Sequence, residues 1–356
     1  MKKRLTGLLG LLALMLALLS ACGAGQRETG NRTAEAASGN TDSARNESPG
    51  TVPATRRESV VGYQLDTVIT LSGYCDRSIL EEGLAECARY ERLLSRTIEG
   101  SDVWRINHAE GKPVEVDPVT AEVIRTGLEI SEITEGAFDI TIGPAVVLWN
   151  FRDPDSPLPS AKALEEAAGR ISWRRVELNG NTVRLPAGMM MDLGGIAKGY
   201  IADAVCAFLR GKGVESAILS FGGNIITIGG KPDGSPWTVG IQDIDRPTGD
   251  IMLAVESRDS STVTSGTYER CFERDGVRYH HLLDPASGWP VQNGLASVTI
   301  LTSSSARADA LSTAVFILGE EKGLALIDAL QNTEAVLIRE DRTIVPSAGA
   351  GSLILR

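Results

Sequence analysis

The order of hydrophobic and polar positions divides the chain into three unlike segments. Residues 5–21 form an uncharged run dominated by leucine. Residues 23–57 contain no Leu, Ile, Met or aromatic side chain, so they offer no hydrophobic face for a folded core. From residue 58 onward, hydrophobic side chains recur at the spacings of strands and helices. The pattern therefore predicts that the folded part of the protein spans residues 58–356.

Strand and helix patterns interleave within this folded part. Helices are indicated where apolar residues recur three and four positions apart, and strands where β-branched residues cluster or alternate with polar ones. We expect helices at residues 77–94, 120–134, 194–209, 305–318 and 321–330. We expect strands at residues 60–72, 174–185, 216–228, 237–242, 252–256, 297–302 and 335–339, the second and third of them interrupted by turns. Hairpins beside interleaved helices predict an α+β fold with a mixed sheet, and a length near the upper limit for one hydrophobic core favours two lobes.

The first 22 residues have the features of an export signal. Three basic residues at positions 2–4 precede the apolar run, which is shorter than the roughly 20 residues needed to span a bilayer. The run ends at Ala21, directly before Cys22, and this arrangement resembles a bacterial lipobox. An ordinary signal peptide with an incidental cysteine is the alternative. We expect residues 1–21 to be a lipoprotein signal peptide and Cys22 to be the lipidated first residue of an extracytoplasmic, membrane-anchored protein.

Residues 22–57 are expected to be a disordered tether that follows the lipidated cysteine. A flexible coil of this length has a root-mean-square reach of roughly 30–35 Å. The whole chain has 46 acidic and 35 basic side chains and a formal net charge of −11, and loss of three basic residues with the signal peptide makes it −14. Such acidity argues against a nucleic-acid partner, which would require a basic patch. Contact with the membrane is expected through the lipid anchor only.

A glycine-rich stretch at residues 191–199, Met-Asp-Leu-Gly-Gly-Ile-Ala-Lys-Gly, follows a predicted strand and begins a predicted helix. Backbone N–H groups at the start of a helix attract anions such as phosphate, and glycine lets a ligand approach the backbone closely. Asp192 is suited to holding a cation or a ligand hydroxyl, and Lys198 to holding a phosphate. A simple helix cap with a tight turn is the alternative.

Three polar residues interrupt the apolar helix predicted at residues 305–318. Asp309 and Thr313 are four residues apart and share a face of the helix, with Ser312 beside them. These residue types lower helix propensity, so their presence in an apolar helix needs a reason. Their hard oxygen atoms suit Mg²⁺ rather than zinc. A solvated polar stripe is the alternative.

Two of the three histidines of the chain, His280 and His281, are adjacent and lie just before Asp284. A histidine near an aspartate can act as a general base, although a structural role is equally compatible with this spacing. The four cysteines after Cys22 show no C-x-x-C spacing, which gives no support for a zinc site or a redox pair. The motifs of serine hydrolases and of Rossmann dinucleotide-binding folds are also absent from the sequence.

Taken in order, these motifs resemble the ApbE family of FAD:protein FMN transferases. The resemblance extends over roughly residues 60–345 and rests on residues 101–107, 136–139, 191–199, 222–224, 264–266, 281–285 and 308–314. It implies that residues 58–356 form an α+β, mixed-sheet catalytic domain of the ApbE-like (T-fold-like) type.

The resemblance also implies a reaction. FAD and Mg²⁺ would bind, FMN would move to a Thr or Ser hydroxyl of an acceptor protein, and AMP would leave. Acceptors of the family are redox proteins at the membrane surface that carry a short Thr-containing motif. Two other interpretations remain open: a pyrophosphatase that passes FMN to water, and a binding lipoprotein for flavin or another solute.

By position, the resemblance assigns individual residues to this site. His281 matches the proposed catalytic base. The metal would be held by Asp309, Ser312, Thr313 and the backbone carbonyl of Gly195. FAD would contact Leu65, Ala137, Phe138, Asp139, Asp192, Lys198 and Leu283. The chain departs from the family pattern at Thr97, Leu65 and Ser312, where relatives often carry an aromatic residue, a methionine and an aspartate, so contacts to the flavin ring and metal affinity are expected to differ.

Overall fold

The computed structural model describes residues 56–246 and 249–355 of the chain. The predicted signal peptide, the predicted lipidation site Cys22 and nearly all of the predicted tether lie outside the described residues. The first strand begins at Glu58, where the sequence pattern places the start of the folded part. No helix in the described ranges combines the length and apolar character that a bilayer span requires.

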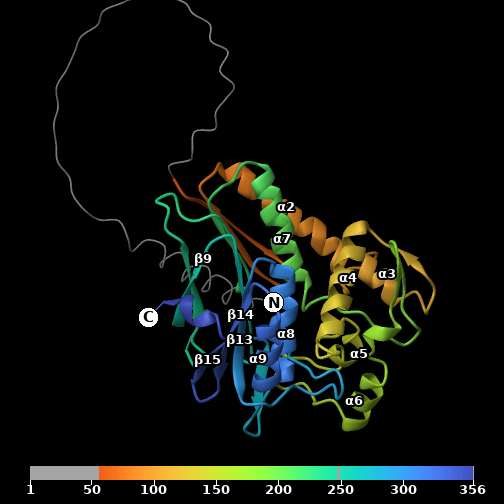
Figure 1. The fold of residues 1–356 in the computed structure, drawn as a ribbon. Coiled ribbons are helices and arrows are strands. Elements are labelled where there is room, and N and C mark those ends of the chain that lie inside the picture. The colour runs from red at the N-terminus through yellow and green to blue at the C-terminus, as the bar shows by residue number, and fades with distance from the viewer. Residues whose placement is uncertain (1–55, 247–248, 356) are drawn as a thin grey trace, which may run out of the picture. The chain divides into compact units, whose positions relative to one another are not determined.

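An eight-stranded sheet lies at the centre of the fold, with strand order β1-β2-β6-β7-β10-β13-β14-β15 (Figure 1). The bounds are Glu58–Gln64 for β1, Thr67–Gly73 for β2, Ala217–Phe221 for β6, Asn224–Ile228 for β7, Ser261–Gly266 for β10, Leu295–Thr302 for β13, Thr333–Arg339 for β14 and Ile344–Pro346 for β15. Every ladder between described strands is antiparallel. The parallel pairing implied by a mixed sheet is limited, in the described ranges, to an isolated bridge between Ile142 and Met190.

Four helices cover one face of this sheet (Figure 1). They are α2 (Arg77–Leu94), α7 (Ala197–Gly211), α8 (Ser305–Leu318) and α9 (Glu320–Ala329). α2 packs on β1 and β2, α7 on β6 and β7, α8 on β10 and β13, and α9 on β14. α8 also packs against α7, and ten of its fourteen residues are buried, so it lies inside the core rather than on the surface.

A three-stranded sheet covers part of the opposite face. Its strands are β16 (Ile354–Leu355), β9 (Ile251–Ser257) and β8 (Trp237–Gln242), in that order. Val239 and Val255 of this sheet pack with Leu301 and Val336 of the central sheet. The neighbour of Leu301 in the chain, Ile300, belongs instead to the larger cluster under the helices. Strands β13 and β14 of the central sheet are therefore buried on both faces, because successive side chains of a strand point to opposite sides.

The remaining elements form a second part of the fold. They are α3 (Asp102–Asn107), α4 (Pro118–Ile133), α5 (Gly143–Val146), α6 (Ala161–Ala168), the small sheet of β3 (Val114–Glu115), β5 (Thr182–Arg184) and β4 (Glu177–Asn179), the hairpin of β11 (Cys271–Arg274) and β12 (Val277–His280), and a 3₁₀ turn at Trp173–Arg175. Another 3₁₀ turn, Ala350–Ser352, belongs instead with the three-stranded sheet and packs on β14. One continuous cluster of buried apolar side chains runs from α4 through α7 and α8 to the central sheet. The two lobes expected from the length therefore share one core.

Two of the predicted helices have the observed bounds, whereas one predicted strand is a hairpin. Arg77–Leu94 and Ser305–Leu318 begin and end where the apolar spacing predicts. The single strand predicted over residues 60–72 is wrong, because the chain turns at Leu65 and Asp66 and β1 pairs with β2. Both turn residues have positive φ, 55° and 60°. Leucine rarely adopts this conformation, so the turn lacks the glycine or asparagine that usually signals it.

The close packing of α7 on α8 depends on Gly199. A methyl group at this position would lie 2.1 Å from the carbonyl oxygen of Ser305, at the start of α8. Gly199→Ala should therefore lower the free energy of unfolding by about 3 kcal/mol, because the two helices must separate to admit the methyl group. Urea unfolding followed by circular dichroism measures this change.

Gly211→Ala is the matched control for that substitution. Gly211 ends the same helix, and a methyl group there would meet no atom within 4 Å. Because alanine restricts the unfolded chain, Gly211→Ala should leave the free energy of unfolding unchanged or raise it by up to about 1 kcal/mol. Equal stabilities of the two variants would contradict the role assigned to Gly199.

Candidate active site

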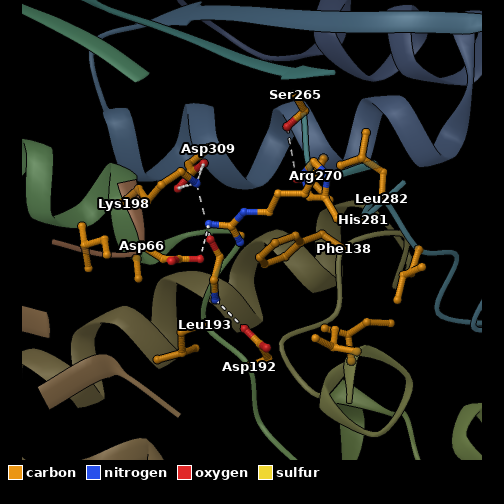
Figure 2. A pocket seen from close by; sticks show the side chains of 18 of the residues that line it. Asp66, Phe138, Asp192, Leu193, Lys198, Ser265, Arg270, His281, Leu282 and Asp309 are labelled. Carbon is orange, nitrogen blue, oxygen red and sulfur yellow. Dashed lines mark hydrogen bonds and ion pairs between the residues drawn. The ribbon is translucent and has the colours of Figure 1, made fainter. Parts of the chain in front are cut away.

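A cavity of about 570 Å³ lies where the helix-covered sheet meets the second part of the fold (Figure 2). Its volume is in the range of small-molecule sites. It brings together segments that are far apart in the sequence: the β1–β2 turn, residues 137–139, the start of α7, residues 281–285 and α8. Eleven of the predicted site residues line it, namely Leu65, Ala137, Phe138, Asp139, Asp192, Gly195, Lys198, His281, Leu283, Asp309 and Thr313.

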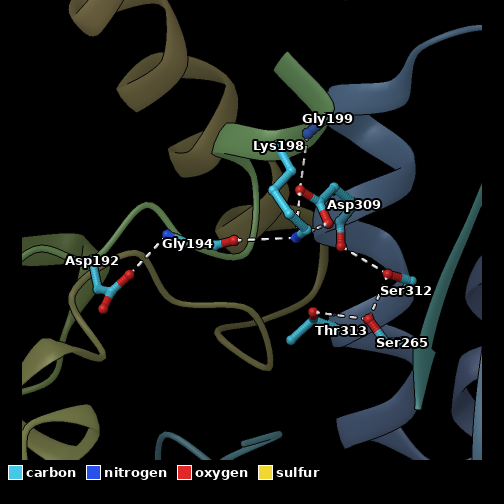
Figure 3. A network of polar contacts seen from close by, with 8 residues as sticks. All are labelled: Asp192, Gly194, Lys198, Gly199, Ser265, Asp309, Ser312 and Thr313. Carbon is cyan, nitrogen blue, oxygen red and sulfur yellow. Dashed lines mark hydrogen bonds and ion pairs between the residues drawn. The ribbon is translucent and has the colours of Figure 1, made fainter. Parts of the chain in front are cut away.

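Asp309 on α8 is almost fully buried, with 3% of its surface exposed. Its carboxylate accepts hydrogen bonds from Lys198 Nζ and from the backbone N–H of Gly199, both at 3.0 Å (Figure 3). A buried carboxylate is stable only with such partners. The solvated polar stripe that we considered for this helix is therefore wrong, and Asp309 faces the start of α7.

The start of α7 binds a carboxylate of the protein itself. The sequence predicts that N–H groups here attract phosphate, but Gly199, in the first turn, donates to Asp309. A negative charge at this end of a helix is stabilising. The helix also begins at Ala197, later than predicted, because Gly194 N–H donates to the Asp192 side chain at 2.7 Å and forms a turn instead.

A chain of hydroxyl groups lies beside Asp309. Ser265 Oγ of β10 lies 2.8 Å from Ser312 Oγ and 3.4 Å from Thr313 Oγ1 (Figure 3). Ser312 is fully buried, donates to the backbone oxygen of Asp309 at 2.9 Å and is not among the residues that line the cavity. Thr313 does line it. The hydroxyl of Thr313 is thus better placed for a ligand than that of Ser312, whose role as a metal ligand stays a prediction.

The Lys198 ammonium group lies among oxygen atoms that could also bind a metal cation. Lys198 Nζ lies 3.0 Å from Asp309 Oδ1 and 3.5 Å from the carbonyl oxygen of Gly194, the neighbour of the predicted ligand Gly195. Mg²⁺ commonly uses one or two carboxylates and completes its coordination with waters and substrate phosphates. Asp309 and Thr313 fit that requirement. A zinc site would need more His, Cys, Asp or Glu ligands than these. No group of three or more such side chains suited to a metal occurs in the described part of the chain.

Asp192 forms an ion pair that the sequence does not reveal. Its carboxylate accepts a hydrogen bond from Arg96 Nε at 2.6 Å, in addition to the one from Gly194. Arg96 follows α2 and is 96 positions away in the chain. The pair fixes the carboxylate at the wall of the cavity, where Asp192 is predicted to contact FAD.

Phe138 and Asp139 occupy the same wall but have different surroundings. A methyl group on Gly195 would lie 2.9 Å from the Phe138 ring, so a glycine is needed for the ring to pack there. The Asp139 carboxylate accepts hydrogen bonds from the backbone N–H groups of Thr141 and Trp173, each at 2.8 Å. Burial raises the pKa of Asp139 despite these bonds. Asp139 therefore stabilises the cavity wall, and its contact with FAD stays a prediction.

His281 has the properties of a proton acceptor. Its Nδ1 atom is buried and has no hydrogen-bond partner within the ranges described. Burial, together with the positive charges of Arg270 and Lys198, lowers the pKa of His281 to about 3. The ring is therefore neutral near pH 7, and in the tautomer that carries its hydrogen on Nε2 the Nδ1 atom can accept a proton from a bound hydroxyl group.

His280 has a structural role instead. Its Nε2 atom lies 3.0 Å from the carbonyl oxygen of Val291, and its Nδ1 accepts from the backbone N–H of Leu282 at 3.3 Å. These partners are satisfied by a neutral ring that is protonated at Nε2. Burial lowers the pKa of His280 to about 4. Of the two adjacent histidines, only His281 lines the cavity.

The buried neutral His280 should make the protein less stable in acid. In the unfolded chain a histidine has a pKa near 6.5, so between about pH 6.5 and pH 4 the unfolded state binds a proton that the folded state does not. The free energy of unfolding therefore decreases as the pH falls through this window. From pH 7 to pH 5 the wild type should lose about 2 kcal/mol more than His280→Gln. Urea unfolding at both pH values measures the difference, and equal losses would contradict a neutral, buried His280.

Several residues of the cavity were not predicted as site residues. Asn224, whose amide nitrogen is buried and unpartnered within the described ranges, belongs to a motif on which the family resemblance rests. Arg96, Glu269 and Arg270 also line the cavity. These three are charged residues in connecting segments, a pattern that sequence alone does not distinguish from solvated surface.

Solved structures with this fold include flavin transferases. The structure matches the ApbE protein of Thermotoga maritima with a TM-score of 0.78 and 31% identity, over 85% of this chain and all of that one. It matches the flavin transferase ApbE of Vibrio cholerae with a TM-score of 0.75 and 27% identity, over 84% and 99% of the two chains. The fold and the cavity therefore place the protein in the flavin transferase class.

The chain belongs to the ApbE family, whose model matches residues 65–337. The FAD:protein FMN transferase of Treponema pallidum (strain Nichols) is 38% identical over 287 residues, which cover 76% of this chain and 79% of the relative. The family resemblance inferred from the ordered motifs is thus confirmed, as is the α+β fold that it implies.

Proposed function

We propose that the protein transfers FMN from FAD to the hydroxyl group of a threonine or serine on an acceptor protein, with Mg²⁺ as cofactor and AMP as the second product. One observation carries the proposal: a single cavity contains the Lys198–Asp309 pair and, across from it, His281, whose Nδ1 has no hydrogen-bond partner among the described residues. Membership of the ApbE family supports flavin transfer, since relatives bear that activity in their names.

The charges that line the cavity support a requirement for a metal ion. Among the described residues, six carboxylates and three cationic side chains line it. Each cationic side chain already contacts a carboxylate, in the pairs Arg96–Asp192, Lys198–Asp309 and Arg270–Asp66. The pyrophosphate of FAD brings two more negative charges to a protein whose net charge is already −11. Additional positive charge must therefore come with the substrate or be bound locally.

We infer that Asp309 and Thr313 would hold Mg²⁺, with the carbonyl group of Gly195 and the hydroxyl group of Ser312 as the further predicted ligands. Bound there, the ion supplies Lewis-acid stabilisation of the transferring phosphoryl group. Lys198, which now contacts Asp309 at 3.0 Å, would then be free to pair with a phosphate oxygen. Phe138, Leu65, Ala137 and Leu283 offer apolar surface for the flavin ring.

The reaction then follows from the position of His281. The acceptor hydroxyl gives its proton to Nδ1 of His281 while its oxygen forms a bond to the FMN phosphorus. The bond between that phosphorus and the bridging oxygen breaks, and AMP leaves with the electron pair. The product is a phosphoester between FMN and the acceptor. If water entered in place of the acceptor, the same steps would release FMN, which is the pyrophosphatase alternative.

The proposed location rests on the sequence of the first 57 residues. A basic start, an apolar run and Cys22 support export and lipidation. The tether of residues 22–57 would let the catalytic domain reach acceptors at the membrane surface. Redox proteins that carry a Thr-containing flavinylation motif are the partners we propose.

Incubation of the protein with FAD, Mg²⁺ and a Thr-motif acceptor tests the proposed function. We expect the acceptor to gain the mass of FMN less water, with one AMP released per modified acceptor. The Thr→Ala acceptor is the control and should gain no mass. Release of free FMN with an unmodified acceptor would instead support the pyrophosphatase, and FAD binding without AMP release would support a binding protein.

A further inference from the structure

Arg270 is the least firmly held of the three cationic side chains in the cavity. It lies between β10 and β11, and its guanidinium group approaches Asp66 at 3.4 Å, an ion-pair distance without a hydrogen bond. The other two cationic side chains donate hydrogen bonds to their carboxylate partners at 2.6 Å and 3.0 Å. Within the described ranges the Arg270 guanidinium group makes no hydrogen bond, so its five N–H donors are available to a ligand.

Asp66 has a second arginine partner. Arg152, from the segment before α6, contacts the same carboxylate. Asp66 would therefore remain paired if Arg270 moved away, and no carboxylate would be left without a partner. The turn that carries Asp66 is itself fixed, because the backbone N–H of Leu65 donates to Glu91 of α2 at 2.8 Å.

Arg270 reaches the part of the cavity where transfer would occur. Figure 2 shows its side chain extending from the side of His281 towards Asp66, close to the Lys198–Asp309 pair. Its positive charge is near enough to His281 to contribute to the lowered pKa of that ring. A planar guanidinium group at such a point matches the geometry of two phosphate oxygens.

We propose that Arg270 binds a phosphate group of FAD, and that Asp66 holds the arginine at the cavity wall until FAD arrives. On binding, the guanidinium group exchanges the Asp66 carboxylate for phosphate oxygens, and Asp66 keeps Arg152. This inference rests on the proposed function in that it takes FAD as the ligand.

Titration of the protein with FAD and with riboflavin, in the presence of Mg²⁺, tests the phosphate contact. Arg270→Gln should weaken FAD binding by about 10- to 100-fold and leave riboflavin binding unchanged, because riboflavin has no phosphate. Arg270→Lys should weaken FAD binding less than Arg270→Gln, since lysine keeps the positive charge but not the planar guanidinium group that binds two phosphate oxygens. Unchanged FAD binding, or an equal loss for both ligands, would overturn the assignment. The matched control is Arg278→Gln, because Arg278 on β12 pairs with Glu273 and does not line the cavity.

A second substitution tests the exchange of partners. Asp66→Asn removes the competing charge and keeps a residue that tolerates the positive φ of 60°. It should strengthen FAD binding several-fold in the wild type and have no effect in the Arg270→Gln background. An equal gain in both backgrounds would show simple repulsion of phosphate by Asp66 and would overturn the exchange. Because these readouts are binding constants, FAD binding without any transfer would contradict the proposed function but not this inference.

Discussion

Replacing Asp309 with alanine should abolish FMN transfer while the chain stays folded. The substitution removes the buried carboxylate that holds Lys198 and the start of α7, and with it the one carboxylate proposed to bind Mg²⁺. We expect transfer to fall by about 10³-fold or more, since metal stabilisation of a phosphoryl group contributes several kcal/mol. Covalent flavin on the acceptor and AMP release measure the loss, and circular dichroism reports the fold.

Asp203→Asn separates this effect from simple loss of a buried carboxylate. Asp203 also lies between α7 and α8, but outside the cavity, where it accepts hydrogen bonds from the backbone N–H groups of Ser305 and Ala306 at 2.8 and 2.9 Å. The Asp203→Asn substitution should lower the free energy of unfolding by about 1–2 kcal/mol and leave the transfer rate unchanged. Full activity of Asp309→Ala with Mg²⁺ present would remove the metal assignment.

Replacing His281 with alanine should slow transfer far more than it weakens FAD binding. The ring is neutral, and its Nδ1, which has no hydrogen-bond partner in the part of the chain that the structure describes, is the proton acceptor proposed to activate the acceptor hydroxyl. Loss of a general base typically costs about 10²- to 10⁴-fold in rate. Single-turnover transfer rates give the first quantity, and titration with FAD gives the second.

His108→Ala is the control for the histidine substitution. His108 follows α3, stacks on Trp104 and does not line the cavity, so its loss should leave the transfer rate unchanged. Equal losses of transfer and of FAD binding in His281→Ala would indicate a binding role for His281 rather than a catalytic one.

The sequence predicts those parts of the fold in which apolar residues recur at one regular spacing. α2 and α8 have the predicted bounds because apolar spacing continues to a clear end. The β1–β2 hairpin was missed because Leu65 carries no turn signal. Strand β10 (Ser261–Gly266) was also missed, since it is rich in Ser and Thr and resembles a loop. In the structure it is a central strand, because it lies between β7 and β13 and nearly all of its residues are buried.

The site was predictable where its residues lie in ordered motifs, and not elsewhere. Asp192 and Lys198 stand in a glycine-rich motif, Asp309 in a helical one and His281 in the segment 281–285, and the structure brings all four to one cavity. Arg270 lies in a connecting segment, where a single charge has no pattern. What makes it notable is its distance to Asp66, more than 200 positions earlier in the sequence, and only the fold supplies that distance.

Helix α8 supplies the proposed metal ligands and is also buried on nearly every side. A substitution on its far face would shift Asp309 and Thr313 as surely as a substitution beside them, since neither can move independently of the packed helix. A library designed to change the nucleotide donor or the acceptor should therefore leave α8 intact. Diversity is better placed at exposed positions such as Asp66 and Arg152, whose side chains belong to none of the core clusters.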